Sequence, residues 1–167
     1  MMIEELAKGF QITVEGFVYD SEISFTVIAD TNNFSGSQKI DNFSVPSKLD
    51  HKIQEKIKAT AKKDIKAVGL NNSFFNCEYW IGDDITLIEI NGWAATAFYE
   101  LYKKVYDYDV LEAGIQLCLG QKPNINLKPD GFGGQFNIVT EKEGNSSDMI
   151  YYDRLPKSCR IFLGPDK

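Results

Sequence analysis

The sequence is poor in the residues on which several classes of enzyme depend. Its only histidine, His51, stands at the start of a predicted helix, so a Ser-His-Asp triad is nearly excluded. Its three cysteines, Cys77, Cys118 and Cys159, are widely separated and lack C-x-x-C spacing. This pattern is typical of reduced thiols in a cytoplasmic protein, and it predicts neither a disulfide framework nor a zinc site.

Long apolar runs and an excess of positive charge are also lacking. No apolar run approaches the ~20 residues needed to span a bilayer, and no basic and then apolar segment opens the chain, so we expect no membrane partner and no secretory signal. Lysine and arginine number 18 against 24 acidic residues, a net charge of −6, which makes a nucleic-acid backbone an unexpected partner. The 167 residues, 43% of them hydrophobic, suit one domain or a closely packed pair of small lobes.

The first half of the chain alternates as strands do and then turns helical. Residues Phe10–Val18 and Glu22–Ala29 predict a long antiparallel hairpin, with Ile23, Phe25, Val27 and Ala29 on the inward face. Residues 30–48 are polar and irregular and predict a loop. From Asp50 to Val68 apolar residues recur at helical spacing, and Gly69 follows as a stop signal, which predicts the clearest helix of the chain.

After the central hairpin described next, the periodicity predicts helices over Gly92–Tyr106 and Val110–Leu119. Beyond Gly120 the pattern weakens. We expect a bend at the glycines of DGFGG leading into a strand at Gln135–Thr140, and further strands at Met149–Asp153 and Arg160–Leu163.

The stretch from Phe74 to Asn91 predicts a hairpin of two short strands joined by the turn residues IGDD. Side chains alternate between faces along a strand, so Glu78 shares its face with residues two positions away, and Glu89 shares its face with Asn91. A two-residue loop would bring all three to one face, as opposite or diagonal neighbours at roughly 5 to 8 Å. A three-residue loop would separate them.

Two neighbouring carboxylates repel unless a cation lies between them. Glu78 and Glu89 with the amide oxygen of Asn91 would form an all-oxygen ligand set suited to Mg²⁺, whose other positions go to water and phosphate oxygens. The alternative is a solvated acidic sheet face, which is what an isolated E-x-N on a strand usually is.

Four stretches, in order, resemble the C-terminal half of an ATP-grasp domain of the biotin carboxylase, carbamoyl-phosphate synthetase large chain and amino-acid ligase type. They are IEELAKG with the strand QITVEGFVYD, the SQK loop, FNCEYW with LIEIN, and YELYKKVYDYDVLEAGIQLCLG. The resemblance implies an α+β fold, an antiparallel sheet with helices packed on one face. It covers residues 1–120 as the ATP-grasp lobe and leaves residues 121–167 as a small strand-rich extension.

The resemblance implies ATP and Mg²⁺ as cofactors. Glu78, Glu89 and Asn91 would be magnesium ligands. Residues Glu4, Glu5, Leu6 and Ala7 would be the hinge beside the adenine, Gln11 would stand near the ribose, and Lys39 would meet a phosphate. In the family, ATP phosphorylates a small-molecule carboxylate, and an amine or similar nucleophile then attacks the acyl phosphate.

The sequence departs from the family pattern in ways that keep other functions open. After E-x-N the family usually has proline or threonine and then arginine, and here Gly92 and Trp93 follow. The N-terminal ATP-grasp half is missing, so we expect a fragment that is inactive on its own and has that half as a partner. The alternatives are a non-catalytic binding or assembly module derived from an ATP-grasp enzyme and, less favoured, a domain for a small apolar ligand.

Overall fold

The computed structural model describes residues 8–34, 40–125, 127–137, 144–145, 152–154 and 156. The chain divides into two compact units, Met1–Asn137 and Ile138–Lys167. The second unit contains a short 3-10 helix, η2 (Tyr152–Arg154), which includes two residues of the strand predicted at Met149–Asp153. The remainder of that predicted strand, like Arg160–Leu163, lies outside the described residues.

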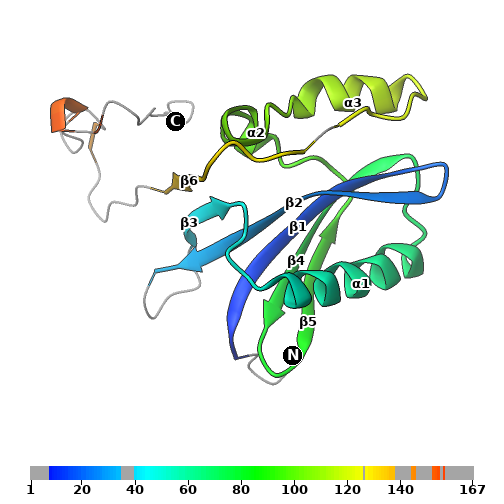
Figure 1. The fold of residues 1–167 in the computed structure, drawn as a ribbon, viewed down its shortest axis with the longest axis horizontal. Coiled ribbons are helices and arrows are strands. Elements are labelled where there is room, and N and C mark those ends of the chain that lie inside the picture. The colour runs from blue at the N-terminus through cyan, green and yellow to red at the C-terminus, as the bar shows by residue number, and fades with distance from the viewer. Residues whose placement is uncertain are drawn as a thin grey trace. The chain divides into compact units, whose positions relative to one another are not determined.

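The first unit is built on a six-stranded antiparallel sheet with the order β5-β4-β1-β2-β3-β6. The strands, shown in Figure 1, are β1 (Phe10–Tyr19), β2 (Glu22–Asn33), β3 (Ile40–Val45), β4 (Ser73–Ile81), β5 (Ile85–Asn91) and β6 (Gly133–Phe136). The helices are α1 (His51–Ala67), η1 (Thr96–Phe98), α2 (Tyr99–Tyr106) and α3 (Val110–Cys118). Among the described helices, none is long and apolar enough to cross a membrane.

The predicted α+β class with an antiparallel sheet is confirmed, but the helices cover both faces of the sheet rather than one (Figure 1). Helix α1 packs Ile57, Ala61 and Ile65 against one face of β1 and β4. Helices α2 and α3 pack on the opposite face, chiefly over β2 and β3. Helices α2 and α3 lie over only part of this face, and on β4 and β5 beside them Glu78 is half-buried and Glu89 is exposed.

Helix α1 forms where the sequence predicted it because a capping residue precedes its first turn and a glycine follows its last turn. The side chain of Asp50 accepts a hydrogen bond from the amide of Lys52 and so caps the first turn. Gly69 adopts a φ of 68°, a left-handed conformation that glycine tolerates without strain, and its amide donates to Lys66.

Three other expectations were wrong in detail. Residues 30–48 are not all loop, because β2 continues to Asn33 and Ile40–Val45 forms β3. The helix expected over Gly92–Tyr106 begins only with η1 at Thr96 and α2 at Tyr99. The strand expected from Gln135 starts earlier, at Gly133, and is described only to Phe136.

The side chains predicted to share the inward face of β2 are divided between the two faces of the sheet. The pairing of β1 with β2 is regular up to Val27 and then shifts by one residue at a β-bulge between Glu15 and Gly16. As a result Val27 and Ala29 join the core under α2 and α3, whereas Ile23 and Phe25 pack on the α1 side. Both sets are inward because both faces of the sheet are covered.

Candidate nucleotide and metal site

Polar side chains occupy the face of the sheet that α1 does not cover. Along β1 and β4 every second residue packs against α1, and the residues between them point to the other face. We call these residues and their neighbours the polar face: Gln11, Thr13 and Glu15 of β1, Thr31 of β2, Asn76 and Glu78 of β4, and Glu89 and Asn91 of β5. The polar face therefore crosses four adjacent strands.

The hairpin of β4 and β5 places Glu78 directly opposite Glu89, and Asn76 opposite Asn91. The loop is not the two-residue loop on which the sequence argument depended, because Ile81 pairs with Ile85 and three residues lie between them. A β-bulge between Glu78 and Tyr79 compensates, since the register shifts there by one residue. The loop is thus the three-residue alternative, which alone would have separated the two glutamates, and the bulge keeps them opposite each other.

The two carboxylates repel each other at this position. Glu78 is half-buried, and its pKa is raised first by burial and then by the charge of Glu89, while a hydrogen bond from Gln11 lowers it. Directly opposite side chains in an antiparallel pair have Cβ atoms about 4.5 to 5.5 Å apart. A cation between them would relieve both the desolvation and the repulsion.

Each carboxylate has an amide beside it. Gln11 Nε2 donates to Glu78 Oε2 at 2.6 Å, and Asn91 Nδ2 donates to Glu89 Oε1 at 2.7 Å. The amide nitrogen of Asn91 is thus engaged, which leaves its Oδ1 as the atom that can ligate a cation. The donor set of two carboxylates and one amide oxygen, all oxygen, fits Mg²⁺.

A second, buried part of the polar face was missed by the sequence analysis. Glu15 is 4% exposed, and its Oε1 accepts hydrogen bonds from Tyr102 Oη at 2.6 Å and Asn76 Nδ2 at 3.0 Å. These bonds tie β1 and β4 to α2. Burial raises the pKa of Glu15 to about 7 in spite of both bonds. The available signal was the alternation of Gln11, Thr13 and Glu15 with the apolar residues of the same strand.

Only part of the predicted nucleotide contacts can be placed. Residues Glu4, Glu5, Leu6 and Ala7 and residue Lys39 lie outside the described residues. The chain enters the sheet at Gly9, which has a φ of 131° and lies so close to β4 that a Cβ there would be 1.9 Å from the carbonyl oxygen of Ile81. Glycine is required here, and the contact fixes the start of β1 against the turn of the β4–β5 hairpin.

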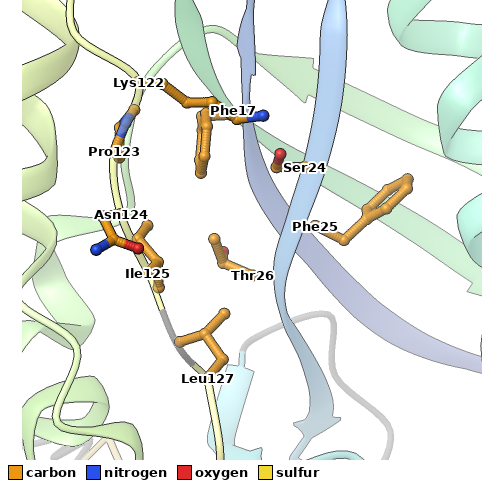
Figure 2. Close-up of a pocket in the computed structure, with 9 residues that line it drawn as sticks. All are labelled: Phe17, Ser24, Phe25, Thr26, Lys122, Pro123, Asn124, Ile125 and Leu127. Atoms are coloured by element: carbon orange, nitrogen blue, oxygen red, sulfur yellow. The ribbon is translucent and has the colours of Figure 1, made fainter.

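No group of three histidine, cysteine, aspartate or glutamate side chains within the described ranges is arranged to hold a metal ion. A metal ion on the polar face would therefore need, besides the carboxylates of Glu78 and Glu89, the amide oxygen of Asn91 and ligands such as water or phosphate oxygens. A separate cavity of about 320 Å³ opens between β2 and the segment that follows α3, as Figure 2 shows, and it is lined in part by Phe17, Thr26 and Lys122. It includes none of the predicted site residues.

Comparison with solved structures adds a fold-level relationship. Phosphoribosylglycinamide synthetase from Anaerococcus prevotii superposes with a TM-score of 0.69 and 26% identity, over 83% of this chain and 37% of that one. An L-amino acid ligase from Bacillus licheniformis superposes with a TM-score of 0.72 and 15% identity, over 82% of this chain and 37% of that one. The biotin carboxylase–β,γ-ATP complex from Campylobacter jejuni superposes with a TM-score of 0.65 and 19% identity, over 78% of this chain and 30% of that one.

All three are ATP-grasp proteins. The fold is that of a partial ATP-grasp domain. The resemblance found in the sequence is thereby confirmed at the level of the fold. The chain spans about a third of the length of these solved structures. No protein-family model and no curated protein matches the sequence.

The ATP-grasp likeness also locates the main departure from the family pattern. Trp93 follows the last strand of the hairpin, and its side chain is 62% exposed at a position where the sequence resemblance implies an arginine. An indole ring carries no positive charge. Within the described part of the chain, the polar face consists of glutamate, glutamine, asparagine and threonine side chains.

Proposed function

We propose that this chain is the ATP- and Mg²⁺-binding lobe of an ATP-dependent carboxylate–amine ligase. In this proposal ATP activates a small-molecule carboxylate as an acyl phosphate, which an amine or similar nucleophile attacks. The observation that carries the proposal is the opposition of the half-buried Glu78 and the exposed Glu89 on neighbouring strands. The ATP-grasp fold supports it.

The proposed magnesium ligands are the carboxylates of Glu78 and Glu89 and the Oδ1 of Asn91. When bound, Mg²⁺ would supply positive charge at the phosphate oxygens, on which phosphoryl transfer depends. The side chains of this lobe hold the carboxylates in place, since each carboxylate receives an amide hydrogen bond. The contacts proposed for Glu4 to Ala7 and for Lys39 with the nucleotide rest on the sequence resemblance, which also implies that Gln11 stands near the ribose.

Trp80 adds an aromatic surface to this proposal. It follows Glu78 by two positions on β4, pairs with Gln11 of the neighbouring strand β1, and is half-buried. Its Nε1 is buried and has no acceptor among the described residues. A half-buried aromatic ring next to a magnesium site is a suitable surface for stacking a nucleobase.

The test is an isothermal titration of the chain with a non-hydrolysable ATP analogue, with Mg²⁺ and then with EDTA. We expect Mg²⁺-dependent binding that Glu78→Gln or Glu89→Gln weakens by at least about tenfold. Asp83→Asn is the matched control, because Asp83 lies in the turn of the same hairpin and outside the polar face. Binding of equal strength in EDTA would remove the magnesium role of both glutamates.

A second candidate is a non-catalytic binding or assembly module of ATP-grasp descent. The observation that favours it is the exposed, uncharged Trp93. The coding sequence upstream of this chain distinguishes the two. A glycine-rich loop with lysines encoded there would support the enzyme, and its absence would support the module.

A further inference from the structure

Gln11 contacts Glu78, one of the proposed magnesium ligands. It lies on β1, where it pairs with Trp80 of β4, and Glu78 is the diagonal neighbour that pairs with Thr13. Its side chain reaches along the strand so that Nε2 donates to Glu78 Oε2 at 2.6 Å. Only 8% of Gln11 is exposed, so it offers little surface to a ribose.

The hydrogen bond constrains the Glu78 carboxylate. An amide N–H can only donate, so Gln11 occupies one carboxylate oxygen and fixes the side chain over the sheet, which leaves the other oxygen for a ligand. Partners of this kind orient metal ligands, and their loss commonly costs about 10- to 100-fold in metal affinity.

An amide side chain suits this position better than a carboxylate would. A carboxylate at position 11 would stand at hydrogen-bonding distance from Glu78, which Glu89 already repels. An amide adds a donor without adding charge. We infer that Gln11 is a positioning residue that holds Glu78 ready to bind Mg²⁺ and does not contact the ribose, an inference that rests on the proposed magnesium site.

The test compares wild type, Gln11→Met and Gln11→Leu. Both replacements are close to glutamine in size and neither can donate a hydrogen bond. Binding of a non-hydrolysable ATP analogue and of its 2′-deoxy form is measured by titration with Mg²⁺ and with EDTA. Gln116→Leu is the matched control, because Gln116 donates to Glu112 at 3.4 Å on the exposed surface of α3.

We expect both Gln11 variants to lose about 10- to 100-fold in Mg²⁺-dependent affinity. Their affinity in EDTA, and their preference for the ribose over the 2′-deoxyribose form, should match wild type. A lost ribose preference with unchanged dependence on Mg²⁺ would overturn the inference in favour of a ribose contact.

Two other outcomes also count against the inference. If neither variant folds, as judged by circular dichroism and urea unfolding, Gln11 is a structural residue. If wild type binds with Mg²⁺ dependence and both variants do the same, the role of Gln11 fails and the proposed function stands. A wild type that shows no Mg²⁺-dependent binding refutes the proposed function, and the role of Gln11 with it.

Discussion

At the scale of single residues, Glu15 shows how a buried acid can link a sheet to a helix. Two donors, Tyr102 and Asn76, converge on one of its oxygens. The pKa of nearby Tyr108 is raised first by burial and then by the charge of Glu15. Burial is the larger effect on Glu15 itself, and its pKa therefore rises from the ordinary 4.5 to about 7. The folded protein consequently holds a proton that the unfolded chain releases.

This difference predicts a pH-dependent stability. Between pH 4.5 and 7 the folded state keeps the proton on Glu15 while the unfolded state loses it, so the free energy of unfolding should fall as the pH rises. The Glu15 contribution amounts to about 3 kcal/mol between the two ends of this range. Urea unfolding of wild type and Glu15→Gln at pH 5 and pH 8 measures it.

Glu15→Gln is a suitable comparison because the carbonyl oxygen of glutamine can accept from both Tyr102 and Asn76 while carrying no charge. Stability should therefore fall more between pH 5 and pH 8 in wild type than in the variant. An equal fall in both proteins would show that other groups titrate and that Glu15 stays ionised in the folded state.

At the scale of elements, β-bulges decide which side chains meet. The bulge in the β1–β2 pairing moves part of β2 from one core to the other, and the bulge in the β4–β5 pairing brings Glu89 back opposite Glu78. One inserted residue reverses the face of every residue beyond it. Such positions are hard to read from alternation alone, because the pattern on each side of the bulge is regular.

Helix α1 supplies a test of the packing on the opposite face of the sheet. Ile65 is fully buried against β1 and β4, whereas Ile53 on the same helix is 37% exposed. We predict that Ile65→Ala lowers the free energy of unfolding by about 2 to 5 kcal/mol, since it removes buried methyl groups and leaves a cavity. Ile53→Ala should cost less than about 1 kcal/mol.

Urea or thermal unfolding of the two variants provides the measurement, and both variants replace an isoleucine by an alanine on the same helix. Equal losses of stability would contradict the placement of α1. They would show that the helix does not turn Ile65 toward the sheet and Ile53 toward its rim.

At the scale of the whole molecule, the described residues of the polar face are acceptors and amide donors, and none of them is a lysine or arginine. Phosphoryl transfer depends on positioned positive charge around the transferring phosphate. The resemblance places such a charge at Trp93, where an indole stands instead. We therefore expect this chain to bind Mg²⁺ and ATP without turning ATP over.

We predict that the chain by itself, supplied with ATP and Mg²⁺, releases phosphate no faster than the Glu78→Gln variant. Phosphate release over hours provides the measurement, and the variant sets the baseline because it lacks a proposed magnesium ligand. Mg²⁺-dependent release that Glu78→Gln abolishes would contradict this prediction and show that the lobe turns over ATP with Trp93 in place of the arginine.

The sequence by itself determined the elements that short-range chemistry controls. The Asp50 cap and Gly69 fix the ends of α1, and alternation fixes the first hairpin and the pair of β4 and β5. Only the tertiary structure decided which side chains of these strands and helices come into contact. The contacts of Gln11 with Glu78 and of Glu15 with Asn76 and Tyr102 join residues 61 to 87 positions apart. Such contacts depend on strand order and bulges, which local sequence patterns do not encode.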